Sequence, residues 1–476
     1  MSAPRPAAVI VLAAGEGTRM KSATPKVLHE VCGRSLVGHM LHASRELEPG
    51  RLIVVVGHAR ERVEGHLASY GDVTSVVQEQ QNGTGHAVRI VLENVGVIEG
   101  TVLVVYGDTP LLRGSTLAGL LAEHESQGNA VTVLTAHVPD PTGYGRIVRG
   151  ADGAVLAIVE HKDATPEQLA IDEMNSGVYA FDGALLADAV KRVSTANSQG
   201  EEYLTDVLSI LREEGHRVGA HVAADHVEVE GVNNKAQLAF ARRVLNDRIV
   251  HDHMVNGVTI VDPASTWIDA DVTLEADAVV HPNTQLHGVS RVGAGAEVGP
   301  GCTLTDTVVG ADAVVRNAVC DSAEIGAGAS VGPFAYLRPG TRLGAKGKIG
   351  TYVETKNAVI GTGSKVPHLS YVGDATIGEG ANIGAATVFV NYDGVDKHHT
   401  TVGDHARVGS DTMLVAPLTI GDGAYTAAGS VIVNDVPPGA MAVARGRQRN
   451  VEGWVIRRRS GTKSAEAAQR ALEEGS

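Results

Sequence analysis

The sequence predicts two architectures in one chain: an N-terminal α/β domain with a doubly wound, mostly parallel sheet, then a linking helix and a C-terminal parallel β-helix of hexapeptide repeats. Three observations predict this. Strand-like apolar runs alternate with helical stretches up to about residue 231. Beyond residue 257, an apolar residue recurs every six positions instead. Glycine accounts for 57 of the 476 residues and aromatic residues for only 3%, which favours tight turns around a narrow interior.

The α/β domain is expected over residues 1–233. Strands are predicted at residues 8–14, 51–57, 100–108, 130–136 and 174–181, and helices at Leu36–Leu47 and Ser115–Ser126. Strands that alternate with helices form βαβ units and a mostly parallel sheet. Because ligands of such sheets bind beyond the carboxyl ends of the strands, polar residues after successive strands form the candidate site.

A linking helix is predicted over residues 234–256. Leu238, Leu245 and Ile249 recur at helical spacing, and Asn234 stands where an N-cap is expected. The period changes after Gly257, so the helix is expected to end there.

The β-helix is expected over residues 257–445. Its six-residue phase runs through Ile268, Leu274, Val280, Leu286, Val292, Val298 and Leu304, then Ile325, Val331, Leu337, Leu343 and Ile349, then Tyr371, Ile377, Ile383 and Phe389, then Val402, Val408, Leu414, Ile420 and Ile432. An α-helix cannot keep such a phase, whereas a coil of three short strands per turn places these residues on inward-facing lines. Residues 391–401 interrupt the phase and should protrude as a loop. Residues 446–476 are polar and charge-mixed and are predicted to form a mobile tail.

The composition argues against several classes of protein. Lys and Arg number 40 and Asp and Glu number 55, so the net charge is -15, which argues against a nucleic-acid-binding surface. The apolar run Ala7–Ala14 is too short to span a membrane and lacks a signal-peptide cleavage pattern. Cys32, Cys302 and Cys320 are far apart and lack zinc-site spacing, which favours packed thiols in a reducing cytoplasm. We therefore expect a soluble, cytoplasmic protein without a membrane or nucleic-acid partner.

Two N-terminal features suit a phosphate-bearing ligand. The segment Leu12–Met20 (LAAGEGTRM) follows the first predicted strand. Its glycines let backbone N–H groups approach a phosphate chain, which Arg19 and Lys26 can neutralise. Asp108 ends a later strand, where one carboxylate can bind Mg²⁺ together with substrate phosphates. The alternatives are an ordinary strand-to-helix turn for the first segment and a capped turn for Asp108.

In the C-terminal half, His368 is the outstanding candidate for chemistry. An imidazole can accept a proton near neutral pH, so a positioned histidine can act as a general base. Arg338, Lys356 and Tyr371 flank this histidine along the sequence and suit a sugar phosphate. A structural histidine in a turn is the alternative.

The chain resembles the sugar-nucleotide pyrophosphorylases in its first half, where their signature LxxGxGTRMxxxxPK matches Leu12–Lys26. With the hexapeptide repeats, residues 8–454 resemble a bacterial family of bifunctional N-acetylglucosamine-1-phosphate uridylyltransferases and glucosamine-1-phosphate acetyltransferases. The resemblance implies a left-handed β-helix, a homotrimer and Mg²⁺. It also implies acetyl transfer from acetyl-CoA to glucosamine 1-phosphate, then uridylyl transfer from UTP, which yields UDP-N-acetylglucosamine and pyrophosphate.

The resemblance implies roles for particular residues as well. In uridylyl transfer, Arg19 and Lys26 are implied to be catalytic, Asp108 and Asn233 to bind Mg²⁺, and the nucleotide and sugar to be bound by Leu12, Ala13, Ala14, Gly15, Lys26, Gln78, Gly83, Thr84, Tyr106, Gly107, Asp108, Gly145, Glu160, Asn175 and Asn233. Gln78, Gly83 and Thr84 would read the uracil ring, and Gly145, Glu160 and Asn175 would hold the amino sugar and its acetyl group. In acetyl transfer, His368 would be the proton acceptor, with Arg338, Lys356, Tyr371 and Asn382 on the amino sugar phosphate and Ala385, Asn391, Tyr392, Ser410, Ala428 and Arg445 on acetyl-CoA.

Two departures from the family pattern concern acetyl transfer. Ala386 stands in NIGAAT where glycine is expected, and residues 444–454 are more basic than expected. The histidines at 251–253 and 398–399 also suggest a metal site, but neither group has a carboxylate or cysteine at a convincing second position.

Two rival hypotheses stay open. The first is a single-activity pyrophosphorylase whose β-helix serves only assembly or regulation, against which His368, Lys356 and Asn391 speak. The second is a non-catalytic binding or scaffold subunit, against which Arg19, Lys26, Asp108 and Asn233 speak.

Overall fold

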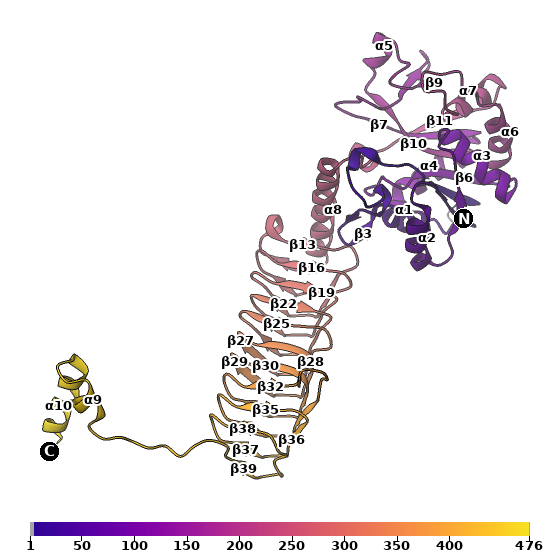
Figure 1. The fold of residues 1–476 in the computed structure, drawn as a ribbon. Coiled ribbons are helices and arrows are strands. Elements are labelled where there is room, and N and C mark those ends of the chain that lie inside the picture. The colour runs from indigo at the N-terminus through magenta and orange to yellow at the C-terminus, as the bar shows by residue number, and fades with distance from the viewer. Residues whose placement is uncertain (1–3, 476) are drawn as a thin grey trace. The chain divides into compact units, whose positions relative to one another are not determined.

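The computed structural model describes residues 4–475 (Figure 1). Its first half is built on a mixed sheet with the strand order β11-β7-β10-β6-β1-β4-β5. These strands are β1 (Ala8–Leu12), β4 (Leu52–Val56), β5 (Thr74–Val77), β6 (Thr101–Tyr106), β7 (Val131–His137), β10 (Glu173–Asp182) and β11 (Val218–Val222). The pairs β1–β4, β1–β6, β4–β5 and β7–β11 are parallel, as predicted.

One central strand departs from the parallel arrangement. β10 runs antiparallel to both β6 and β7, and Tyr179 lies opposite Val104 on one side and Val133 on the other. The hairpin of β8 (Arg146–Arg149) and β9 (Val155–Val159) joins the same sheet through β10. A run that is buried on both faces looks alike in a parallel or an antiparallel strand, so its sequence does not reveal its direction.

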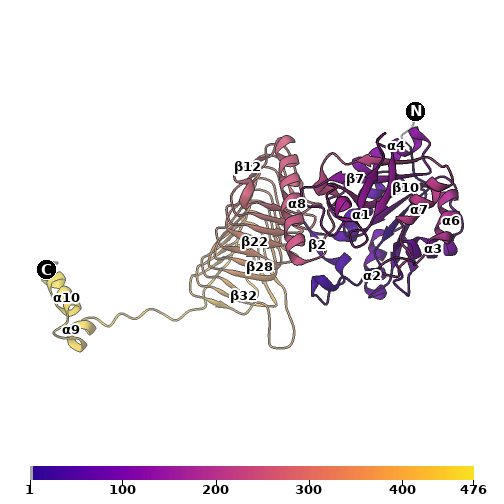
Figure 2. The same ribbon diagram turned by 90° about the horizontal axis from the view of Figure 1, so that it is seen from above.

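Helices cover both faces of the sheet, which confirms the doubly wound domain. The helices are α1 (Leu36–Arg45), α2 (Arg60–Leu67), α3 (Thr84–Val95), α4 (Gly114–Gln127), α5 (Pro166–Leu169), α6 (Gly183–Ala189) and α7 (Asp206–Glu213). Val9 and Val11 pack in the core with α1, α2 and α4, whereas Ala8 and Ile10 pack with α3, α6 and α7. Successive side chains of β1 therefore enter different cores. Figures 1 and 2 show α3, α6 and α7 side by side.

The predicted linking helix is α8 (Lys235–Val255). The Asn234 side chain accepts a hydrogen bond from the backbone N–H of Gln237 at 2.9 Å, which confirms the N-cap. Asn246 is fully buried, donates to the Thr266 carbonyl at 2.9 Å and accepts from the Ile268 N–H at 2.9 Å. These bonds join the helix to the first coil of the β-helix.

A short hairpin also contacts the first coil. It consists of β2 (Glu30–Val31) and β3 (Arg34–Ser35). The N–H of Ala270 donates to the Cys32 carbonyl at 2.9 Å, and the Arg34 guanidinium pairs with Asp271 at 2.6 Å. The hairpin begins four residues after Lys26, so the first coil supports a segment close to the predicted phosphate-binding lysine.

The remaining chain to Ala442 is the predicted left-handed parallel β-helix. By its internal contacts, the whole chain divides into a unit of residues 1–295 with 299–306 and a unit of residues 296–298 with 307–476. In the first unit the strands are β12 (Thr259–Ile260), β13 (Trp267–Ile268), β14 (Thr273–Leu274), β15 (Val279–Val280), β16 (Gln285–His287), β17 (Arg291–Val292) and β19 (Thr303–Thr305). Trp267 pairs with Gln285 and Thr273 with Arg291, in each case 18 residues or three hexapeptides later, so one turn holds three strands.

The same pairing continues within the second unit. One sheet holds β18 (Glu297–Val298), β21 (Val314–Val315), β24 (Ser330–Val331), β27 (Lys348–Thr351), β29 (Lys365–His368), β31 (Asn382–Ile383), β34 (Arg407–Val408), β37 (Tyr425–Thr426) and β39 (Met441–Ala442). The other holds β20 (Val308–Val309), β22 (Ala318–Asp321), β23 (Glu324–Ile325), β25 (Ala335–Leu337), β26 (Arg342–Leu343), β28 (Glu354–Ile360), β30 (Tyr371–Ile377), β32 (Val388–Val390), β33 (Thr400–Val402), β35 (Met413–Val415), β36 (Leu418–Ile420) and β38 (Val431–Ile432). Figure 1 shows these strands stacked coil on coil.

The residues of the predicted six-residue phase form the interior with two exceptions. Leu274 is only partly buried. At the start of β30 the prediction was wrong, because Val372 is fully buried while Tyr371 is partly exposed. The spacing between consecutive buried residues shortens there from six to five, from Val372 to Ile377, so the inward-facing position moves by one residue. The insert predicted at 391–401 does leave the coils, and Val395 within it is 83% exposed.

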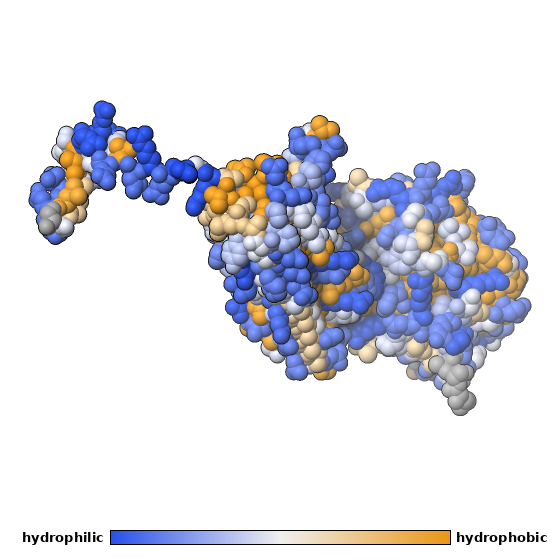
Figure 3. All heavy atoms as spheres, turned by 90° about the horizontal axis from the view of Figure 1, so that it is seen from below, coloured by the Kyte–Doolittle hydropathy of each residue, from blue (hydrophilic) through white to orange (hydrophobic). Residues whose placement is uncertain are grey.

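The tail contains two helices that the sequence analysis did not predict, α9 (Trp454–Arg458) and α10 (Lys463–Glu474). The Thr462 side chain caps α10 by accepting from the Ala465 N–H at 3.3 Å. Figure 3 shows hydrophobic residues gathered on the β-helix where the tail begins, and Val431, Met441 and Val443 are exposed in its last coil. No helix within residues 4–475 is long and apolar enough to cross a membrane.

Candidate functional site

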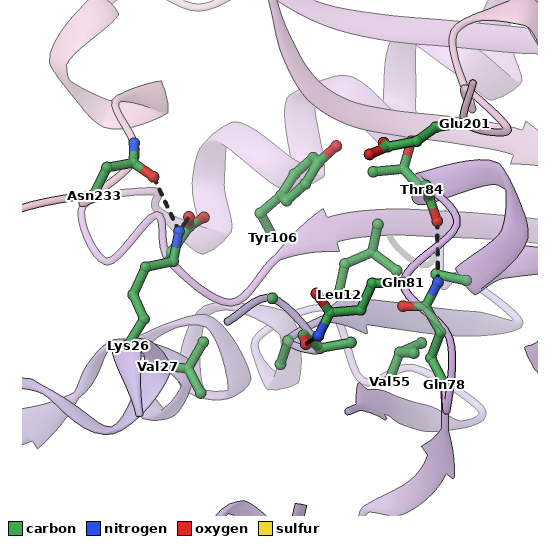
Figure 4. Close-up of a pocket in the computed structure, with 16 residues that line it drawn as sticks. Leu12, Lys26, Val27, Val55, Gln78, Gln81, Thr84, Tyr106, Glu201 and Asn233 are labelled. Atoms are coloured by element: carbon green, nitrogen blue, oxygen red, sulfur yellow. Dashed lines mark hydrogen bonds and ion pairs between the residues drawn. The ribbon is translucent and has the colours of Figure 1, made fainter. Parts of the chain in front are cut away.

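A cavity of about 390 Å³ opens beyond the carboxyl ends of β1 and β6. Eleven of the residues assigned to the nucleotide site line it: Leu12, Ala13, Ala14, Gly15, Lys26, Gln78, Gly83, Thr84, Tyr106, Asp108 and Asn233. Figure 4 shows Lys26 and Asn233 turned toward each other at one end, Gln78, Thr84 and Glu201 at the other, and Tyr106 between them. The cavity thus has a charged end and an amide-rich end, as a phosphate-bearing nucleotide requires.

The charged end joins three distant parts of the chain. The Lys26 ammonium donates to the Asp108 carboxylate and to Asn233 Oδ1, the latter at 3.0 Å. Arg19, which does not line the cavity, donates to the same Asn233 oxygen at 2.9 Å. The side chains of Lys26 and Asp108 are only 14% and 16% exposed, which strengthens their attraction relative to water.

The donor set at this end fits a magnesium ion. Asp108 and Asn233 present a carboxylate oxygen and an amide oxygen to one cation, the Lys26 ammonium, and such hard oxygens are the ligands that Mg²⁺ prefers. Within residues 4–475, no group of three histidine, cysteine, aspartate or glutamate side chains could hold a metal. Substrate oxygens would therefore complete the coordination. His398, one of the histidines that suggested a metal site in the sequence, pairs with the Asp393 carboxylate at 2.7 Å.

At the amide-rich end, two glutamine side chains form hydrogen bonds with backbone carbonyls. Gln78 Nε2 donates to the Gly83 carbonyl at 3.1 Å. Gln81 Nε2 donates to the Ala14 carbonyl at 2.7 Å, which ties this loop to the glycine-rich segment. Gly83 has a φ of 107°, a conformation that favours glycine.

The three residues assigned to the amino sugar lie together but do not line the cavity. A methyl group on Gly145 would lie 3.5 Å from both Glu160 Oε1 and Asn175 Cβ. The N–H of Asn175 donates to the Gly145 carbonyl at 2.9 Å. Burial, and then the nearby carboxylates of Asp163 and Asp206, raise the pKa of Glu160.

Tyr106 lies between these sugar residues and the charged end. Burial, and then the charges of Asp108 and Glu160, raise the pKa of its phenol. A methyl group on Gly177 would collide with its ring at 2.2 Å, so glycine leaves the space that the ring occupies. Gly107 does not line the cavity, and its N–H donates to the Leu12 carbonyl at 2.9 Å behind it.

On the β-helix, one polar cluster gathers most of the residues assigned to the sugar phosphate. Arg338 pairs with Glu354 at 2.9 Å, and Glu354 lies in register with Tyr371. Asn391 donates to the Tyr371 hydroxyl at 3.5 Å. The close approach of the Lys356 ammonium lowers the pKa of Lys397, a residue of the protruding loop. The Asp374 carboxylate acts on both lysines and offsets part of their repulsion.

Asp374 anchors this cluster. Burial alone would raise the pKa of its carboxyl, but hydrogen bonds from Asn357 at 2.9 Å and Asn391 at 2.6 Å hold that pKa below its usual range. Asn391 is thereby fixed beside Tyr371. Tyr392, the next residue, is 56% exposed, and its hydroxyl donates to the Gly394 carbonyl at 2.6 Å.

Four of the six residues assigned to acetyl-CoA, namely Ala385, Ser410, Ala428 and Arg445, follow one corner of successive coils with His368. The other two, Asn391 and Tyr392, belong to the polar cluster and the protruding loop. The carbonyl of His368 accepts from the Ala386 N–H at 3.2 Å, and that of Ala385 accepts from Asp411 at 2.7 Å. Further along, the Ser410 carbonyl accepts from Gly429 at 2.9 Å, and the Ala428 carbonyl accepts from the Arg445 guanidinium at 3.0 Å. His368, Ser410, Ala428 and Arg445 are exposed along this line.

The two groups of acetyl-transfer residues lie in different sheets of one chain. His368 ends β29 and Asn382 begins β31, both in the sheet that contains β27 and β34. Lys356 and Tyr371 lie on β28 and β30 of the other sheet. Asn382 is in register with Lys365 and Arg407, whereas Arg338 pairs with Glu354, although the resemblance assigns both Asn382 and Arg338 to one ligand.

Comparison with known proteins agrees with both halves of this arrangement. Residues 9–165 match the MobA-like NTP transferase domain. Proteins named Bifunctional protein GlmU are similar over nearly the whole chain. The one from Streptomyces avermitilis is 71% identical over 472 residues, which cover 98% of each chain. The one from Thermobifida fusca is 63% identical over 476 residues, which cover 99% of this chain and 98% of its own.

The chain belongs to the family of bifunctional GlmU proteins. The expected bifunctional transferase family is thus confirmed, and the nucleotidyltransferase half is the one with the cavity. As a GlmU protein it is an enzyme, so the hypothesis of a non-catalytic scaffold is wrong. The roles of individual residues stay predictions.

Three residues beside the GlmU sites were missed by sequence reasoning. Gln81 and Glu201 line the cavity, and Lys397 lies beside Lys356. Lys397 had a signal, because it belongs to residues 391–401, which were expected to protrude as a loop. Gln81 had one as well, because it lies between Gln78 and Gly83, both assigned to the uracil ring. Glu201 had none, because it follows no predicted strand and lies more than a hundred residues after the segments that it meets.

The cysteines carry no chemistry in this arrangement. Cys302 and Cys320 are buried and Cys32 is half-buried, and none of the three is in a disulfide. Burial raises the pKa of the Cys32 thiol to about 12, so the nucleophilic thiolate is disfavoured. Packed thiols were predicted.

Proposed function

We propose that this chain makes UDP-N-acetylglucosamine at two separate sites. The β-helix transfers an acetyl group from acetyl-CoA to glucosamine 1-phosphate, and the α/β domain then transfers a uridylyl group from UTP to the product. The observation that carries the proposal is the cavity, where eleven assigned residues meet with cationic groups at one end and amide groups at the other. Three cysteines without a disulfide favour action in the reducing cytoplasm.

Uridylyl transfer at this cavity is an in-line substitution. A phosphate oxygen of N-acetylglucosamine 1-phosphate attacks the α-phosphorus of UTP, a P–O bond forms, and the bond to pyrophosphate breaks. Both reactants are anions, so positive charge and positioning supply most of the catalysis. Lys26 and Arg19 provide that charge, and Gln78, Gly83 and Thr84 orient the base. Mg²⁺, bound through Asp108 and Asn233, would neutralise phosphate oxygens.

Acetyl transfer needs one proton acceptor and no covalent intermediate. The His368 imidazole accepts a proton from the ammonium group of glucosamine 1-phosphate, whose nitrogen then attacks the thioester carbonyl of acetyl-CoA. The C–S bond breaks, an amide forms and CoA leaves as its thiol. Lys356 and Arg338 neutralise the sugar phosphate, while Ala385, Ser410, Ala428 and Arg445 line the corner assigned to CoA.

We propose that three chains assemble so that neighbouring β-helices complete each acetyl-transfer site. The support is that the assigned residues are divided between two sheets of the coil: His368 and Asn382 lie in one, and Lys356 and Tyr371 in the other. A neighbouring copy related by rotation can bring the two sets together across one interface.

The decisive experiment supplies the purified protein with glucosamine 1-phosphate, acetyl-CoA, UTP and Mg²⁺ and follows CoA and pyrophosphate separately. Both products should appear, and pyrophosphate should depend on prior acetylation. Pyrophosphate formation from acetylated sugar phosphate without any CoA release from the free amine would favour the single-activity hypothesis.

The domain division at residues 233 and 257 makes a separate prediction. A fragment ending near Arg248 should convert N-acetylglucosamine 1-phosphate to UDP-N-acetylglucosamine within about tenfold of the full-chain rate, because the cavity lies wholly before residue 234.

The matched control is a fragment of residues 1–306, which keeps the first coils and the Arg34–Asp271 pair. A folded shorter fragment without activity, beside an active longer one, would show that the first coil is needed and the division is wrong.

A further inference from the structure

Residues 82–86, called the base loop below, comprise the end of the loop before α3 and the first residues of that helix, and a distant segment holds them from outside the cavity. The N–H of Gly85 donates to the Glu202 carbonyl at 2.8 Å, and the N–H of Glu202 donates to the Asn82 carbonyl at 2.8 Å. Two residues on, the N–H of Leu204 donates to Thr84 Oγ1 at 3.1 Å. Residues 202–204 therefore fix the backbone of the base loop and the rotamer of Thr84.

The contact is too close for larger residues in the base loop. A methyl group on Gly83 would lie 2.4 Å from the Glu202 carbonyl oxygen, and one on Gly85 would lie 3.0 Å from it. A small movement of residue 202 would consequently move the base loop as well, because closely packed backbone has no free space to absorb it.

The Glu202 side chain is bound to the helix that the base loop begins. Its carboxylate receives two hydrogen bonds from Arg89, at 3.1 Å from Nε and 2.7 Å from Nη2. The Glu202 and Arg89 side chains are 17% and 29% exposed. Two parallel N–H···O bonds to one carboxylate define both distance and orientation. Arg89 lies on α3, five residues after Thr84. The side chain of Glu202 and the backbone of residues 202–204 therefore bind the same helix.

We propose that Glu202 is a positioning residue for uridine recognition, acting through Arg89 to hold the base loop in its nucleotide-binding conformation. The inference rests on the proposed function in one respect, that Gly83 and Thr84 contact the base. Glu202 itself does not line the cavity, whereas Glu201 does. Its effect must therefore reach the nucleotide through the base loop.

The test exploits a second carboxylate on the same arginine. Arg89 Nη1 also donates to Glu93 at 2.8 Å, a surface pair in which the Glu93 side chain is 58% exposed. Glu202→Gln should raise KM for UTP roughly three- to tenfold and change kcat and KM for the sugar phosphate less than about twofold. Glu93→Gln, which removes the same charge from the same arginine, should leave all three constants unchanged.

Two further variants separate positioning from simple stability. Arg89→Gln should raise KM for UTP as much as Glu202→Gln, and the double variant should add no further increase, because both remove one interaction. Glu202→Asp, which keeps the charge, should restore part of the affinity. A lower melting temperature with unchanged KM, or an equal rise in KM for both substrates, would overturn the positioning role.

The dissociation constant of UTP, measured by calorimetry, keeps this test independent of catalysis. It should rise in Glu202→Gln and stay unchanged in Glu93→Gln. Unchanged UTP binding in both variants would reject the role of Glu202 even if the proposed function held. Absence of UTP-dependent pyrophosphate release from the unmodified protein would instead contradict the proposed function.

Discussion

Replacement of His368 by alanine is expected to lower acetyl transfer about 10²- to 10⁴-fold, because a positioned general base contributes a factor of that size. The imidazole is exposed at the end of β29. The backbone carbonyl of His368, which the variant keeps, accepts the hydrogen bonds from Ala386 and from Ser370 Oγ. The coil should therefore stay intact. Uridylyl transfer should remain, since its residues all precede position 234.

The measurement is CoA thiol release at saturating substrates, with KM for both substrates, the melting temperature and the oligomeric state. His405→Asn is the matched control, because His405 is an exposed corner histidine of the same β-helix that lies outside the assigned site. It should leave both activities unchanged. Loss of both activities together with assembly in His368→Ala would support a structural histidine, and unchanged acetylation would remove His368 as the base.

Replacement of Asp108 by alanine is expected to lower uridylyl transfer by at least about 10²-fold, because the metal contributes several kcal/mol of charge stabilisation. Asp108 is the only carboxylate in the proposed ligand set, and Asn233 offers only a neutral amide oxygen. The Lys26 ammonium also loses its ion-pair partner. Acetyl transfer should be spared, since its residues lie on the β-helix.

Pyrophosphate release measured over a range of Mg²⁺ concentrations tests this prediction. Asp72→Ala is the matched control, since Asp72 is an exposed carboxylate of the same domain that does not line the cavity. The Asp108 variant should need far more Mg²⁺ to reach any given rate. Normal uridylyl transfer at limiting Mg²⁺ would show that the metal assignment is wrong.

A site residue could be predicted from the sequence where the residues next to it form a recognisable motif. The glycine-rich segment with Lys26 and the strand ending in Asp108 point to one sheet edge, because the carboxyl ends of neighbouring parallel strands meet there. Their direct contact with each other and with Asn233 could not be predicted. It joins side chains up to 207 residues apart, and no local pattern encodes such a pairing.

The β-helix shows a similar division. The six-residue period predicted its coils, and nearly all of the residues that it placed inside are buried, because each must reach the same narrow core. It did not predict buried residues such as Val315 and Val366, where the six-residue phase is interrupted. The slip that buries Val372 in place of Tyr371 depends on how one corner turns. The approach of Lys397 to Lys356 depends on how the loop folds back. Both are decided by packing between coils.

The sequence by itself determined the two architectures, the linking helix with its cap at Asn234, and the segments that carry the chemistry. These follow from periodicity, turn residues and helix-capping residues, which act over a few positions. Only the tertiary structure decided that β10 runs antiparallel, that Glu201 lines the cavity and that Glu202 meets Arg89. The physical reason is that strand direction and side-chain contacts over long stretches of chain depend on the packing of the whole domain, in which each contact forms only because many others form with it.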